Sequence, residues 1–275
     1  MFSLLERAVN AVKENKLAYI FLIPVLLFLG ALVWYPFLHG IFISLHEWVA
    51  FSDEHQFIGL DNFKWFVNSE VARTSIIATL IYVTGAVFQL AIGVVAAIGL
   101  NQKFVRFKPF WFTVFIIPYS MPPIVSGTIW LYLGEPNLGV VPHYLQKIGI
   151  LSSPIYWQSQ GEWGMLVITF VMVWALWPLT FIMIRSAIQK IPRSQYEVAK
   201  AYGANWFQRV TRIVLPQIKL TILIVFLIRV VWDLIKVSQV LQLTGGGPGY
   251  ETSILPVLMY RYAYYRADFG KGYTI

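Results

Sequence analysis

Apolar residues dominate five long runs along the chain, and short polar connections separate them. The runs cover residues 17–43, 73–100, 108–133, 163–188 and 217–243. A helix of roughly 20 apolar residues crosses the hydrocarbon layer of a bilayer. The pattern therefore predicts an all-α, polytopic membrane helical bundle.

A sixth helical stretch is expected after the fifth run. The residues from Thr244 to Gly249 include three consecutive glycines and Pro248, which cannot continue a helix and mark a tight outer turn. The next stretch starts at about Thr252, and Arg261, Arg266 and Lys271 interrupt it. The sequence stops at Ile275 before another apolar run, so we expect about six spans with the last one cut short.

The first 16 residues differ from the rest of the chain. Apolar and basic positions alternate there at helical spacing, which predicts an amphipathic helix on the cytoplasmic surface. Glu6 and Glu14 and the long apolar run that follows argue against a cleavable signal peptide. We therefore divide the chain into a cytoplasmic N-terminus, residues 1–16, and a transmembrane permease domain, residues 17–275.

Composition supports a membrane protein: 58% of the residues are hydrophobic and only 12% are charged. The net charge of +8 arises from Lys and Arg that cluster before the first run, between the second and third, and between the fourth and fifth. Such clustering marks cytoplasmic connections and not nucleic-acid binding. We expect a multi-pass protein of the cell membrane, embedded in the lipid bilayer, with a cytoplasmic N-terminus and no nucleic-acid partner.

Motifs for catalysis and metal binding are missing from the sequence. There is no cysteine, and the four histidines lack ligand spacing, so no metal site is expected. No nucleophile motif and no G-x-x-x-x-G-K-[ST] phosphate-binding loop occurs. We therefore expect a chain without catalytic residues or a cofactor of its own, and keep an ion-coupled secondary transporter of a small polar solute as the alternative to an ATP-driven system.

Residues 192–216, between the fourth and fifth runs, are predicted to form a helix-turn-helix elbow. Ser194 and Glu197 have the spacing of a capping box, and Gly203 is placed to end the first helix in a left-handed conformation. A second short helix is expected from Asn205 to Arg212, and Pro216 suits the first turn of the fifth span.

One face of this elbow is predicted to carry aromatic and small side chains at helical spacing: Tyr196, Ala199, Tyr202 and Trp206. Exposed aromatic residues on such a helix favour binding to a partner. The spacing alone equally allows the elbow to lie on the protein's own cytoplasmic surface, with Glu197 acting only as a cap.

The elbow resembles the conserved loop of binding-protein-dependent ABC importer permeases. The pattern Glu-x-Ala-x-x-x-Gly, followed by Ile-x-Leu-Pro, is carried by Glu197, Ala199, Gly203, Ile213, Leu215 and Pro216. Val198 stands where the family usually has alanine, and Tyr202 where it usually has aspartate. Residues 57–63, Ile117-Pro118 and the Gly-Gly-Pro turn after Leu243 resemble the carbohydrate-uptake branch, MalF-like type.

The resemblance implies a fold of the type I ABC importer transmembrane-domain kind. It implies that the elbow docks in a groove of an ATP-binding subunit through Glu197, Ala199, Gly203 and Ala204. The implied partners are a second permease subunit in a heterodimer, two copies of the ATP-binding subunit, which bind ATP and Mg²⁺, and an extracytoplasmic solute-binding protein. A sugar, a disaccharide or a polyol phosphate would suit as solute.

Charged residues within the fifth run mark a candidate substrate pathway. Arg229, Trp232, Asp233 and Lys236 share one helical face, and charges at membrane depth favour a water-filled or protein interior. We expect this face to line a cavity; the alternative is an Arg229–Asp233 pair. Tyr119 and Ser120 are added to the pathway because the nearby prolines interrupt the third run.

Overall fold

The computed structural model describes residues 15–52, 54–102 and 104–275. Most of the predicted N-terminal amphipathic segment, residues 1–14, lies outside these residues. The described chain forms two compact units: residues up to Asn68 together with Met259–Ile275, and Ser69–Leu258. Apart from two strands of two residues each, the regular structure in the described ranges is helical, which confirms the all-α prediction.

Four helical stretches are long and apolar enough to cross a membrane: Lys16–Ser44, Glu70–Leu100, Gly161–Gln189 and Trp206–Leu234. The first consists of α2 (Lys16–Leu29), a π-helical turn η1 (Gly30–Trp34) and α3 (Tyr35–Ser44). The second and third are the single helices α5 (Glu70–Leu100) and α9 (Gly161–Gln189). These stretches correspond to four of the five predicted spans.

The remaining predicted span, residues 108–133, is bent. It divides into α6 (Lys108–Ser120) and α7 (Pro123–Leu133), which meet at an angle of 95°. Met121 and Pro122 are extended at the break, and neither Pro122 nor Pro123 has an N–H to continue the helical ladder. The interruption predicted from the prolines is therefore confirmed.

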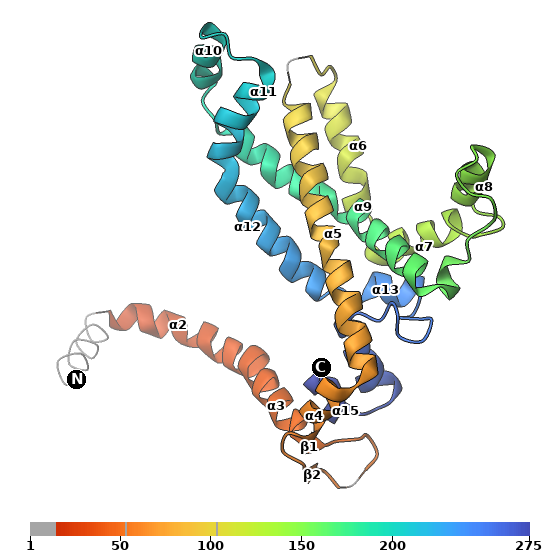
Figure 1. Ribbon diagram of the computed structural model, residues 1–275. Helices are drawn as coiled ribbons and strands as arrows, with labels where there is room; N and C mark the ends of the chain where they lie inside the picture. Colours follow the sequence, from red (N-terminus) through yellow and green to blue (C-terminus); the bar gives the residue numbers. More distant parts are fainter. Residues whose placement is uncertain (1–14, 53, 103) are drawn as a thin grey trace. The chain divides into compact units, whose positions relative to one another are not determined.

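In the second unit, α5 packs against α9 more extensively than any other described pair of helices, and Figure 1 shows α9 crossing α5. Glycines on α5 permit this approach. A Cβ atom at Gly85 would lie 2.5 Å from Met172 Cε, and one at Gly93 would lie 2.9 Å from the backbone nitrogen of Phe181. Small residues at such contacts let helix backbones approach closely within a bilayer.

The two ends of the second unit carry different segments. At one end lie the α5–α6 connection and the two short helices α10 (Arg193–Ala201) and α11 (Trp206–Arg209) (Figure 1). At the other end lie α7, α8 (Val140–Lys147), the 3₁₀ turn η2 (Trp157–Ser159) and α13 (Ser238–Leu243) (Figure 1). The hydrophobic core at the first end includes Phe181, Ile184 and Ile218. The core at the second end includes Ile168 and Met172.

The fifth span differs from its predicted bounds of 217–243. Helix α12 (Leu215–Leu234) ends before Ile235, and α13 follows as a separate short helix. The predicted turn after Leu243 is confirmed: Gly245, Gly246 and Gly249 have positive φ angles, and the Gly247–Pro248 peptide bond is cis. The hydroxyl groups of Thr244 and Thr252 lie 2.6 Å apart across this turn.

Helix α14 (Leu255–Tyr260) follows the turn and continues as the π-helical η4 (Arg261–Tyr265), and α15 (Phe269–Thr274) comes after a break. Within the first unit, α15 packs on α3, with the ring of Tyr273 against Gly40. The hairpin of β1 (His46–Glu47) and β2 (Gln56–Phe57) is antiparallel, and α4 (Asp61–Asn68) follows it. The buried Asn62 amide of α4 donates to the carbonyl oxygens of Ser44 and His46, both at 2.9 Å.

Candidate functional site: the elbow and a buried polar cluster

The elbow begins with α10, whose start differs from the prediction. Pro192 occupies the N-cap position, and no side chain caps the helix. Ser194 therefore lies inside the first turn, and the predicted capping box of Ser194 and Glu197 is wrong. The reason is local: Pro192 has a non-helical ψ of 134° and takes the N-cap position, so the helix starts at Arg193, two residues earlier than the capping box requires.

The end of α10 follows the prediction. Gly203 has a φ of 77°, the left-handed conformation that glycine adopts without steric cost. Its N–H donates to Lys200 O at 3.0 Å, and the N–H of Ala204 donates to Ala199 O at 2.9 Å. These two bonds are the pair expected where a left-handed glycine closes a helix, and they reverse the chain direction at Gly203.

The elbow's capping box lies on α11 instead. Asn205 Oδ1 accepts from the N–H of Gln208 at 2.8 Å, and Gln208 Oε1 accepts from the N–H of Asn205 at 2.9 Å. The second helix does not stop at Arg212 as predicted. It continues through the π-helical turn η3 (Val210–Val214) into α12, so the elbow's second arm is the start of the fifth span.

Several apolar side chains of the elbow are exposed, together with the charged side chains of Glu197 and Lys200. Tyr202 is 88% exposed, and Val198, Trp206 and Phe207 are exposed as well. Tyr196, predicted on the same face, instead packs on the buried cluster below, and its partial burial raises the pKa of its phenol. Gln217 Nε2 donates to Gln195 Oε1 at 2.5 Å and fastens α10 to the start of α12. The elbow is thus attached to the rest of the unit through Gln195 and Tyr196, while Tyr202 and Trp206 remain exposed.

The four predicted docking residues occupy different parts of this elbow. Glu197 is exposed on α10 and forms no ion pair with any residue that the structure describes. Gly203 is exposed at the turn, and Ala199 and Ala204 are half-buried beside it. The sequence analysis did not include Phe207 or Val198 among the docking residues, although both are exposed apolar side chains of the elbow, as Tyr202 and Trp206 are.

In the second unit, a buried polar cluster joins α5 to the last turns of α12. Arg229 and Asp233 have no exposed side-chain surface, and Arg229 Nη2 lies 2.5 Å from Asp233 Oδ1. Gln89 of α5 bridges them: its Oε1 accepts from Arg229 Nε at 2.5 Å, and its Nε2 donates to Asp233 Oδ2 at 3.0 Å. The pairing that the sequence left as the alternative describes the geometry of these two residues.

The other predicted pathway residues are more accessible. Trp232 is 43% exposed, and the guanidinium carbon of Arg229 lies 5.9 Å from its ring centre. Lys236 is half-buried just beyond α12, and Tyr119 and Ser120 are exposed at the end of α6. Gln89 was missed, although an amide within a run of apolar residues was a signal available in the sequence.

Comparison with known proteins assigns the family. The sequence profile described as "Binding-protein-dependent transport system inner membrane component" matches residues 89–274, which include the whole elbow. The chain belongs to this family. As an inner membrane component of a binding-protein-dependent transport system, the permease is a multi-pass membrane protein, and the ion-coupled alternative is not favoured.

Relatives along nearly the whole chain agree with this family. The permease is 30% identical to a probable ABC transporter permease protein, YurN, of Bacillus subtilis, over 96% of this chain and 91% of the relative. It is 28% identical to the trehalose/maltose transport system permease protein MalF of Thermococcus litoralis, over 96% and 88%. Its fold resembles a bacterial alginate ABC transporter solved with an alginate-bound periplasmic protein, with a TM-score of 0.80, 24% identity, and coverage of 96% and 88%.

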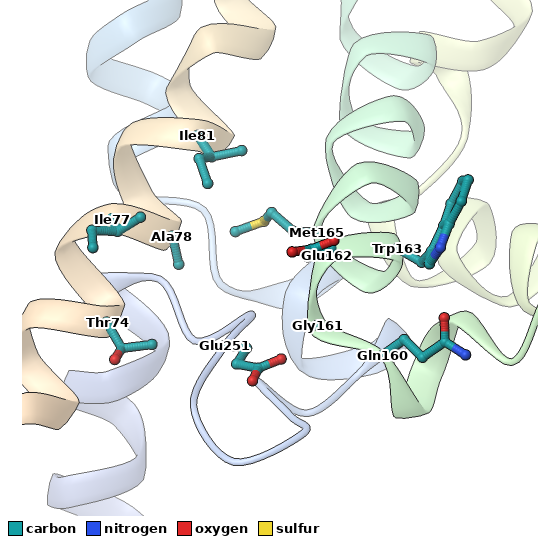
Figure 2. A pocket seen from close by; sticks show the side chains of 10 residues that line it. All are labelled: Thr74, Ile77, Ala78, Ile81, Gln160, Gly161, Glu162, Trp163, Met165 and Glu251. Atoms are coloured by element: carbon teal, nitrogen blue, oxygen red, sulfur yellow. The ribbon is translucent and has the colours of Figure 1, made fainter.

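The permease also has an open pocket of about 560 Å³ at the end away from the elbow. Figure 2 shows the carboxyl groups of Glu162 and Glu251 between α5 and the start of α9. Glu251 lies against Gly161, where a Cβ atom would overlap its carboxyl group. None of the six predicted pathway residues lines this pocket, so it is separate from the candidate pathway.

Proposed function

We propose that this permease forms half of the translocation pathway of an ATP-driven importer and receives the energy of ATP hydrolysis through its elbow. The observation that carries the proposal is the bare apolar surface of Val198, Tyr202, Trp206 and Phe207 on a short helix pair that is fixed from beneath. Exposed aromatic side chains on a rigid support are favourable contacts for a partner protein.

The proposed complex has a second permease subunit, two ATP-binding subunits that hold ATP and Mg²⁺, and an extracytoplasmic solute-binding protein. The permease sequence itself has no phosphate-binding loop, so nucleotide chemistry is assigned to the partners. The basic residues of the elbow, with Arg106 and Lys108 at the same end of the second unit, support a cytoplasmic elbow end. The same rule supports a cytoplasmic N-terminus.

A sugar or a related polyol is the proposed solute. The support comes from the relatives, one named as a trehalose/maltose permease and one solved as an alginate transporter. Aromatic side chains with polar neighbours suit sugars, because a sugar ring stacks on an aromatic plane while its hydroxyls form hydrogen bonds. Trp232, with Lys236 and Tyr119 as polar companions, supplies such groups.

We place the solute pathway along Trp232, Lys236, Tyr119 and Ser120, beside the buried Arg229–Asp233 pair. Trp232→Ala is the informative change because the Trp232 side chain lies outside the buried pair. The variant complex should assemble normally and show a raised KM for solute uptake into vesicles. Wild-type uptake kinetics in Trp232→Ala would remove Trp232 from the pathway.

Charge reversal tests the elbow. Glu197→Lys should abolish co-purification of the ATP-binding subunit, since it places a cation in the proposed interface. Glu162→Lys is the matched control: it reverses another exposed glutamate, on the first turn of α9 at the opposite end of the unit. The control should retain the ATP-binding subunit. Full retention by Glu197→Lys, with normal ATP-driven uptake, would refute docking through the elbow.

A further inference from the structure

A polar seam joins α7 and α13 at the end of the second unit away from the elbow. Figure 1 shows the two helices side by side there, and they are in contact. Gly127 makes the close approach possible, because a Cβ atom at that position would lie 2.5 Å from Gln242 Oε1. The neighbours of Gly127 on α7, Ser126 and Thr128, supply the hydroxyl groups of the seam.

Two glutamines of α13 donate across the seam. Gln239 Nε2 donates to Ser126 Oγ at 3.4 Å, and Gln242 Nε2 donates to Thr128 Oγ1 at 2.5 Å. Each hydroxyl group donates its own proton within α7, Ser126 to Pro123 O at 2.8 Å and Thr128 to Ile124 O at 2.9 Å. Both hydroxyls therefore act only as acceptors across the seam, which fixes the orientation of both amides.

The seam leaves acceptors unused. The amide oxygens of Gln239 and Gln242 are buried and have no hydrogen-bond partner among the described residues. A buried acceptor without a partner is unfavourable, so this arrangement does not satisfy the two glutamines fully. An arrangement that admits water or solute hydroxyls to these oxygens would satisfy them better. The two hydrogen bonds hold α7 and α13 together. The two unpaired amide oxygens lower the free-energy cost of separating the helices.

The seam's place in the chain connects it to the proposed pathway. Helix α7 follows the break at Met121 and Pro122, directly after Tyr119 and Ser120. Helix α13 follows the break at Ile235–Val237, which contains Lys236 and begins three residues after Trp232. Both helices are therefore joined to the pathway segments by non-helical residues, where a rotation changes few backbone hydrogen bonds.

We propose that the α7–α13 seam closes the outer end of the solute pathway, and that Gln239 and Gln242 are positioning residues whose bonds to Ser126 and Thr128 must separate for solute to enter. This inference rests on the proposed function. It adds where the pathway is closed and which side chains hold it closed.

A reversible disulfide across the seam tests the proposal. Because the sequence contains no cysteine, the two introduced thiols are the only ones in the permease. In the full complex in proteoliposomes, Gly127→Cys/Gln242→Cys places two thiols across the seam; a Cβ at residue 127 lies 3.5 Å from Gln242 Cγ, near disulfide reach. Oxidation should reduce solute uptake to the level of protein-free liposomes, and a reductant should restore it. The two single-cysteine variants are controls and should not respond to the oxidant.

The outcomes separate this inference from the proposed function. Equal uptake by the oxidised and reduced double variant, with the disulfide formed, would overturn the seam as a closure, and so would failure of the disulfide to form. A wild-type complex without ATP-driven uptake would instead refute the proposed function.

A second variant covers the case in which the reduced cysteine pair is itself inactive. Gln239→Leu/Gln242→Leu removes both donors and should raise ATP hydrolysis without solute by roughly 2–10-fold, the effect of losing a hydrogen bond of typical strength. Gln158→Leu is the matched control, because Gln158 donates to Leu243 O of α13 at 3.0 Å without crossing the seam. Unchanged hydrolysis in the double leucine variant would overturn the inference.

Discussion

The elbow and the buried polar cluster differ in how much of their side chains is exposed. Tyr202 of the elbow is 88% exposed, whereas Arg229 of the cluster has no exposed surface. The elbow's charged residue, Glu197, lies in the open, while Asp233 is enclosed by Arg229 and Gln89. Exposed apolar side chains are available to a partner, whereas a buried charge that is paired within the chain serves the chain's own packing.

This difference assigns a role to each region. Gln89 makes the Arg229–Asp233 pair a connection between α5 and α12, so the fifth span is fixed to the second through the cluster. The same span begins at the elbow, because α11 runs through η3 into α12 without a gap. A force on the elbow therefore reaches the cluster along one helical stretch, and of these two regions the elbow is the exposed one.

The largest expected effect comes from breaking the cluster. Arg229→Leu leaves Asp233 buried without its cation, and breaking a buried pair in this way costs about 3–5 kcal/mol. We expect a large loss of folded permease in detergent, measured by its thermal unfolding midpoint. Arg229→Leu/Asp233→Leu removes both charges and should recover most of that loss. Failure of the double variant to recover stability would mean that the cluster stabilises the fold through more than paired charge.

A smaller effect, specific to the elbow, is expected at its turn. Gly203 and Gly149 both have a φ of 77° with open space around them, so alanine at either position meets the same backbone cost, about 1–2 kcal/mol. Both variants should lose similar stability. Only Gly203→Ala should weaken the coupling of ATP hydrolysis to uptake, because it strains the turn between α10 and α11. Equal coupling in the two variants would show that the geometry at Gly203 is not needed for it.

Much of the elbow was predictable from the sequence because its signals are local. Gly203 ends α10 in the predicted conformation, since glycine alone adopts it without steric cost. The long apolar runs likewise located the spans, because their length and composition suffice. The predicted capping box failed for a local reason as well: with Pro192 as N-cap the helix starts two residues early, and Asn205 with Gln208 supplies the box on the next helix.

What the sequence could not give depends on contacts between distant segments. Gln89 and Asp233 lie 144 positions apart, and their contact exists only once α5 packs beside α12. Periodicity placed Arg229 and Asp233 on one face but left open whether that face met a cavity or another helix. Tyr196 and Tyr202 also looked equivalent by spacing, and only the packing of α10 on the cluster below separates them.

The central claim is that the exposed face of the elbow binds the ATP-binding subunit, and the affinity of that subunit for Tyr202→Ala tests it most directly. Removing an exposed tyrosine should leave the permease's own stability unchanged but weaken binding by roughly 2 kcal/mol or more if it is a central contact. Tyr144→Ala, on the exposed α8 at the opposite end, is the control and should bind normally. An affinity for Tyr202→Ala equal to that of the control would contradict the claim.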